Sequence, residues 1–135
     1  MPEFLFTPQA NPVLPVFCKS VNHETQAVIS KGTIYVSGNI GCDKDMKIVG
    51  DIKAQTRAAL ENIAIVLKAA GSGLDSIVKA NIYLTNMARD FGPMNEVYAE
   101  FFDKDKMPAR TCIGVAALPM GADFEMECTA EIPEK

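Results

Sequence analysis

The residues best suited to chemistry lie in the segment PARTCIGVAALPMGADFEMECTA, which spans residues 108–130. Arg110 offers a planar fork of N–H donors that matches a carboxylate, and Glu125 offers an acid or a base. Cys112 follows Arg110 by two residues, so in a strand both side chains point to the same face. We therefore interpret Arg110 and Glu125 as the best candidates for catalysis, with Cys112 beside them.

Two short strands joined by a Leu-Pro-Met-Gly turn are predicted to hold these residues. If the two strands pair as a hairpin, Arg110 and Glu125 share a face only when paired residue numbers sum to an odd value. The turn length leaves that register open, and a site could also take Arg110 from one subunit and other groups from the next. In the second strand, alternation predicts one apolar face, Phe124, Met126, Cys128 and Ala130, and one polar face, Glu125, Glu127 and Thr129.

The rest of the chain predicts an α+β fold in a single domain over residues 1–135. Asp51 is a plausible N-cap for the longest helix, and Gly71 is a plausible stop. A second helix should bury a stripe containing Phe91, Met94 and Tyr98, and the strand before it should turn Val78, Ala80, Ile82 and Leu84 to one side. We expect strands at 3–6, 27–30, 33–40 and 76–84, helices at 52–70 and 91–102, and an irregular arm at 11–17.

Two helices can cover only one face of the mixed or antiparallel sheet that these strands would form. The other face must then be polar or buried by a partner. A symmetric oligomer that packs sheet faces together would suit this pattern.

Composition excludes several classes of function. The 135 residues include 48% hydrophobic and 22% charged residues, which is typical of a globular chain. A net charge of -4 counts against nucleic-acid binding, and no run of about 18 apolar residues predicts a membrane span. The four cysteines lack a C-x-x-C pair, so neither a metal site nor a disulfide framework is expected. A cytoplasmic location is the default, with mitochondrial or nuclear location left open.

The segment PARTCIGVAALPMGADFEMECTA closely resembles the C-terminal signature of the Rid family, the YjgF-type (RidA-like) reactive intermediate deaminases. The resemblance extends through IYVSGNI, IVKANIYL and FGPMNEVYAEFF, and covers nearly the whole chain in the expected order. It implies a chorismate-mutase-like homotrimer with sites between subunits. It also implies hydrolysis of 2-imino and enamine acids, such as 2-aminoacrylate, 2-iminopropanoate and 2-iminobutanoate, to 2-keto acids and ammonia without a cofactor.

The resemblance also assigns roles to individual residues. It places the carboxylate-binding arginine on Arg110, its neighbouring cysteine on Cys112, and the water-positioning glutamate on Glu125. The V-S-G serine and glycine fall on Ser37 and Gly38, and the asparagine of the second helix falls on Asn95. Phe17 stands where the family commonly has tyrosine, so the ring is kept and the phenolic hydroxyl is lost.

Each residue also has a simpler explanation when it is taken alone. An arginine at a strand start often forms a surface salt bridge, and alternating glutamates often line a solvated strand face. The resemblance also implies the alternative function, a non-catalytic small-molecule-binding or regulatory trimer of the same fold, because some relatives lack the activity. A ribonuclease or translation inhibitor is the weakest reading, because the chain is acidic and has no basic stripe.

Overall fold

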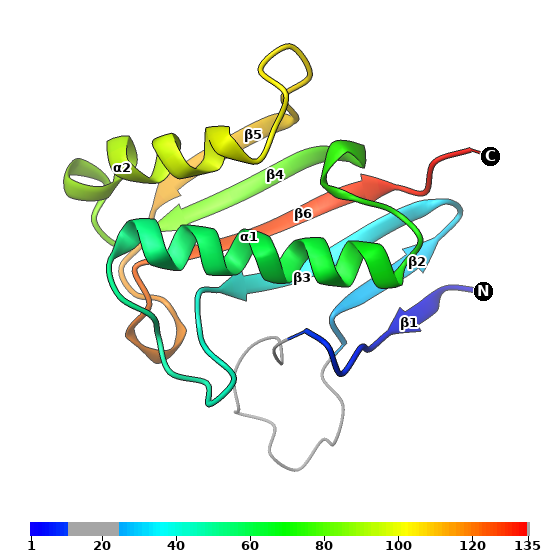
Figure 1. The fold of residues 1–135 in the computed structure, drawn as a ribbon, viewed down its shortest axis with the longest axis horizontal. Helices are drawn as coiled ribbons and strands as arrows, with labels where there is room; N and C mark the ends of the chain where they lie inside the picture. The colour runs from blue at the N-terminus through cyan, green and yellow to red at the C-terminus, as the bar shows by residue number, and fades with distance from the viewer. Residues whose placement is uncertain (11–24, 135) are drawn as a thin grey trace.

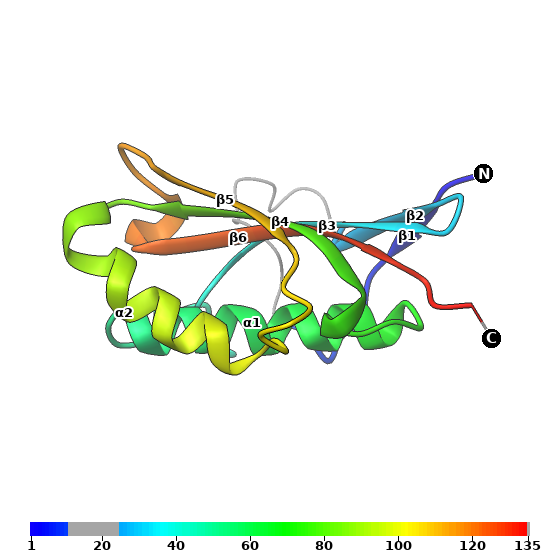
Figure 2. The ribbon, with the colours of Figure 1, turned by 90° about the horizontal axis from the view of Figure 1, so that it is seen from above.

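Both helices lie on one face of a six-stranded sheet, as Figure 2 shows with the sheet seen nearly edge-on. The computed structural model describes residues 1–10 and 25–134. The strand order is β1-β2-β3-β6-β4-β5, and only the β4–β5 pair is parallel. The predicted α+β fold with a mixed sheet is confirmed (Figure 1). The elements are β1 (Glu3–Leu5), β2 (Ala27–Ser30), β3 (Thr33–Ile40), α1 (Ile52–Ala69), β4 (Ile77–Leu84), α2 (Met87–Glu100), β5 (Ala109–Gly114) and β6 (Phe124–Glu131).

Helix α1 begins and ends where its capping residues require. The Asp51 carboxylate accepts a hydrogen bond from the Ala54 N–H at 3.0 Å and so satisfies a free N–H of the first turn. Gly71 adopts a φ of +84°, a conformation that suits glycine after the last helical turn. The apolar stripe packs on the sheet and is fully buried at Leu60, Ile63 and Leu67. The predicted N-cap and the predicted stop of this helix are confirmed.

Strand β4 lies between β6 and β5, so the last two strands do not pair as a hairpin and the condition for their register does not apply. Residues 77–114 instead run as strand, helix, strand, and α2 is the crossover that parallel neighbours require. Strand β6 runs antiparallel to both β3 and β4. Arg110 is therefore on an edge strand, and Glu125 is on a central strand.

Two local predictions are also wrong. The register shifts between Ile77 and Lys79, so Ile77 is buried and Val78 is 44% exposed, while the other predicted apolar positions of β4 stay buried. Helix α2 begins at Met87, one turn earlier than expected, because the Asn86 side chain caps it. Phe91 is 40% exposed, against the prediction, while Met94 and Tyr98 are buried as predicted.

The core lies between the helices and the sheet, and among the described residues no helix covers the other sheet face, which we call the open face. Phe124, Met126, Cys128 and Ala130 point into the core, as predicted from their alternation. The open face carries large hydrophobic side chains, including Tyr35, which is 52% exposed. Among the described residues, no helix is long and apolar enough to cross a membrane.

Candidate active site

Arg110 is held against α2 by a hydrogen bond and two aromatic rings. Its Nη1 donates to Asn95 Oδ1 at 2.7 Å. Its Cζ lies 4.8 Å from the ring centre of Tyr98 and 5.9 Å from that of Phe91, both within the range of a cation–π contact. The remaining N–H groups have no hydrogen-bond partner among the described residues, so they are free to hold a carboxylate.

Cys112 shares the helix-side face with Arg110, as predicted. Arg110 pairs with Ala80 of β4 and Cys112 pairs with Ile82, and both β4 residues are buried in the core. The Cys112 thiol lies 3.9 Å from the Met87 sulfur. Burial raises the pKa of Cys112, while the Arg110 charge partly opposes that rise. The thiol is therefore held in its neutral form and is suited to lining a site rather than to nucleophilic attack.

Glu125 lies on the opposite, open face, in register with Tyr83 of β4 and Ile40 of β3. Burial, and then the charge of Glu127, raise the pKa of the Glu125 carboxyl. Its carboxylate passes directly over Gly38, where a Cβ atom would come within 2.6 Å of Glu125 Oε1. Gly38 is thus the residue that leaves room for Glu125.

Glu127, two residues further along β6, is held by its neighbours on β4. It accepts hydrogen bonds from the Tyr83 hydroxyl and from Asn81 Nδ2. The hydrogen bond to Glu127 is the main reason that the pKa of Tyr83 rises to about 12. Glu127 is therefore occupied within the chain, which leaves Glu125 as the glutamate available to a ligand.

Ser37 directly precedes Gly38 on β3. Its hydroxyl donates to the Thr25 carbonyl at 2.8 Å, and its N–H bonds the Gln26 carbonyl at 3.0 Å. These bonds tie the segment entering β2 to β3 beside Glu125. Phe17 lies outside the described residues.

The structure thus groups the predicted site residues into two separate sets. Arg110, Asn95 and Cys112 lie on the helix side of the sheet edge, whereas Glu125 and Gly38 lie on the open face. Along β4, the partners of Arg110 and Glu125 are Ala80 and Tyr83, three residues apart, or about 10 Å. One chain does not bring Arg110 and Glu125 to the same small molecule.

Sequence reasoning placed Tyr98 and Phe91 in the core stripe and missed their contact with Arg110. The signal was present, because Phe91, Asn95 and Tyr98 recur at helical spacing and so lie on one side of α2. Asn95 was recognised, and its helical neighbours should then have been assigned to the same site.

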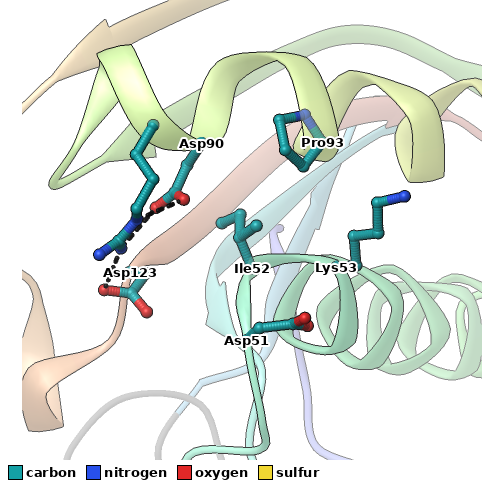
Figure 3. Close-up of a pocket in the computed structure, with 7 residues that line it drawn as sticks. Asp51, Ile52, Lys53, Asp90, Pro93 and Asp123 are labelled. Atoms are coloured by element: carbon teal, nitrogen blue, oxygen red, sulfur yellow. Dashed lines mark hydrogen bonds and ion pairs between the residues drawn. The ribbon is translucent and has the colours of Figure 1, made fainter.

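The pocket in Figure 3 is a different feature. It has a volume of about 500 Å³, lies between the first turns of α1 and α2, and contains none of the predicted site residues. Its two cationic side chains are already paired, Arg89 with Asp90 at 2.8 Å and Lys53 with Glu96 at 2.6 Å. The pairing leaves little unbalanced positive charge for an anionic ligand.

A family model described as Endoribonuclease L-PSP matches residues 18–132, which is most of the chain. The chain belongs to this family, the Rid or YjgF type.

Individual relatives support the assignment. RutC family protein UK114 of Drosophila melanogaster is 50% identical over 114 residues, covering 83% of this chain and 81% of that protein. A Rattus norvegicus protein named 2-iminobutanoate/2-iminopropanoate deaminase is 40% identical over 108 residues, covering 78% and 77%. The solved structure of E. coli TdcF with bound serine is similar with a TM-score of 0.82 and 30% identity, covering 96% of this chain and 98% of that one.

Proposed function

We propose that this Rid-family protein hydrolyses 2-imino acids and their enamine forms to 2-keto acids and ammonia. The observation that carries the proposal is the Arg110 guanidinium, fixed by Asn95 with its other donors unpartnered among the described residues. A carboxylate is the ligand that a positioned arginine fork binds best, because two parallel N–H···O bonds fix its plane and its position. Every 2-imino acid carries such a carboxylate.

The reaction needs one further group, which Glu125 supplies. Glu125 orients a water molecule and accepts its proton as the water oxygen bonds to the imine carbon. The same carboxyl then donates that proton to the nitrogen of the carbinolamine formed from the protonated imine. As the carbon–nitrogen bond breaks, the hydroxyl gives its proton back to the Glu125 carboxylate and becomes the keto oxygen, so ammonia and the 2-keto acid are released. Burial raises the pKa of Glu125, which suits a carboxyl that must both take and return a proton.

We place the complete site between subunits of a homotrimer. Arg110 and Glu125 lie on opposite faces of one sheet, so a substrate held by the first must meet the second from a neighbouring chain. The open face that carries Glu125 also exposes hydrophobic side chains suited to burial by a partner. Each trimer would then contain three equivalent sites.

The relatives support the chemistry. The rat relative is named for deamination of 2-iminobutanoate and 2-iminopropanoate, and the E. coli structure holds serine, a small molecule with a carboxylate. The alternative, a trimer that binds small carboxylates without catalysis, is favoured only by Phe17, which replaces the hydroxyl-bearing ring common in the family.

The test couples a pyridoxal-phosphate enzyme that releases 2-aminoacrylate to this protein and follows the decay of that intermediate. Wild type should accelerate the decay, and Arg110→Ala should reduce kcat/KM on the order of 100-fold, because the carboxylate loses its charged bidentate partner. Arg57→Ala is the matched control. Arg57 also pairs with a carboxylate, Glu100 at 3.0 Å, and also faces a phenylalanine ring, but it lies on the surface.

The outcomes separate the two functions. Arg57→Ala should match wild type. If wild type fails to accelerate the decay beyond the protein-free rate but still binds a 2-keto acid through Arg110, the protein is a binding module and the deaminase proposal is wrong.

A further inference from the structure

We propose that Tyr98 is a positioning residue that sets the plane of the Arg110 guanidinium, and that it does so through its ring rather than its hydroxyl. This inference rests on the proposed role of Arg110 in binding the substrate carboxylate. It adds to that site a residue that touches no substrate.

Without a second contact, the plane of the Arg110 guanidinium would be free to rotate. An arginine side chain has several rotatable bonds, and the single hydrogen bond from Nη1 to Asn95 fixes one nitrogen without fixing the guanidinium plane. Bidentate recognition depends on that plane, because both N–H···O bonds must point at the same carboxylate. A second contact is therefore needed.

The Tyr98 ring provides that contact from a rigid position. Its centre lies 4.8 Å from Arg110 Cζ, closer than the ring of Phe91 at 5.9 Å. Tyr98 is only 2% exposed, and on another side its ring packs against Phe102 with the ring centres 4.7 Å apart. Phe91, by contrast, is 40% exposed and has more freedom to move. Tyr98 is thus the more firmly held of the two rings.

The hydroxyl of Tyr98 does not help to position Arg110. It is buried without a hydrogen-bond partner among the described residues. Burial raises the pKa of Tyr98 to about 12, so the group stays neutral and adds no charge to attract Arg110. Removing the hydroxyl while keeping the ring should therefore preserve the positioning, whereas removing the ring should not.

Three variants test the proposal in the 2-aminoacrylate assay. Tyr98→Leu should raise KM about three- to tenfold, which lies between the values expected of an exposed and of a fully desolvated cation–π contact, with a smaller change in kcat. Tyr98→Phe should restore KM to within about twofold of wild type. Phe102→Leu is the structural control, because it removes a neighbouring ring but keeps an apolar side chain packed against Tyr98, so its KM should stay at the wild-type value even if its melting temperature falls.

A nuclear magnetic resonance measurement tests the geometry without any turnover. The Arg110 Nε–H proton, identified by its loss in Arg110→Ala, should be shifted by the ring current of Tyr98. The shift should persist in Tyr98→Phe and Phe102→Leu and disappear in Tyr98→Leu. This readout still judges the proposal if wild type has no deaminase activity, which would refute the proposed function alone.

Two results would overturn the inference. One is an Arg110 resonance that does not change in Tyr98→Leu. The other is a Tyr98→Phe variant whose KM rises as far as that of Tyr98→Leu, which would assign the effect to the hydroxyl.

Discussion

At the scale of single side chains, Gly38 is the position where an added side-chain atom would collide with Glu125. A Cβ atom at position 38 would lie 2.6 Å from Glu125 Oε1, which no side chain tolerates without movement. The atom that must move is the end of a flexible side chain, so the fold can survive the change while the carboxylate is displaced. The glycine is therefore a requirement of the site more than of the fold.

Gly38→Ala should accordingly separate activity from stability. We expect kcat/KM to fall on the order of 100-fold, because a displaced carboxylate no longer places its water, while the free energy of unfolding changes by less than about 1 kcal/mol. Kinetics and urea denaturation of the same preparation measure both. Gly92→Ala, at a glycine with no atom within 4 Å of the added Cβ, should leave activity unchanged. Unimpaired catalysis in Gly38→Ala would remove Glu125 from the mechanism.

The raised pKa of Glu125 also has a consequence for stability. Burial and the Glu127 charge raise this pKa above the ordinary value of 4.5. The folded state then holds the proton more tightly than the unfolded chain does. The resulting stabilisation is fully present below pH 4.5 and is lost as pH rises through the raised pKa.

Glu125→Gln, which cannot ionise, should therefore unfold at higher urea concentration than wild type at about pH 7. The difference should shrink toward zero as the pH approaches about 4, where both side chains are neutral. A variant that is less stable than wild type at neutral pH, or a difference that does not depend on pH, would contradict this account.

At the scale of elements, Asp123 connects both helices to the start of β6. Its carboxylate accepts from Gln55 of α1 at 2.9 Å. It also lies 3.3 Å from the Arg89 guanidinium of α2 (Figure 3). Its N–H donates to Gln55 Oε1 at 2.8 Å. Since Glu125 follows two residues later, this junction fixes the strand end from which Glu125 projects.

Asp123→Ala should cost about 1–3 kcal/mol of unfolding free energy, because Gln55 is only 1% exposed and its amide would lose a buried partner. Asp123→Asn keeps an oxygen that can accept from Gln55 and loses only a partly exposed ion pair, so its cost should stay below about 1 kcal/mol. Urea denaturation of both variants makes the comparison. Equal losses would show that the pair with Arg89, rather than the bond to Gln55, carries the stability.

The helices and strands differ in how far the sequence predicts them. Asp51, Gly71 and the alternation in β6 act through neighbours in the chain, so the bounds of α1 and the core face of β6 followed from local pattern. The strand order could not be predicted from local pattern, because pairing across the sheet depends on contacts between residues that are distant in sequence. The strand–helix–strand order of residues 77–114 was nevertheless a signal for a parallel crossover, and it would have excluded the hairpin.

The residue types of a motif also do not determine on which sheet faces their side chains lie. Arg110 and Glu125 were both selected as site residues from the sequence, but their faces depend on how β5 and β6 flank β4. The shift at Val78 is a further example, since a bulge has no clear pattern in a strand of apolar residues.

At the scale of the whole molecule, the uncovered sheet face supports assembly. Tyr35 and Ile113 are 52% and 46% exposed there, and Glu125 lies on the same face. A trimer that covers this face would bury these side chains and bring Arg110 of one subunit to Glu125 of the next. The proposed chemistry and the proposed assembly therefore depend on each other.

Subunit complementation tests this central claim most directly. Arg110→Ala and Glu125→Gln are unfolded and refolded together at equal concentration, and also separately, and each sample is assayed for 2-aminoacrylate decay. A site between subunits needs an intact arginine from one chain and an intact glutamate from the next, which random assembly supplies at about a quarter of the sites. The mixture should thus recover about a quarter of wild-type activity, while each variant alone stays inactive. No recovery from a mixture whose mass is about three times 14.6 kDa would contradict the shared site.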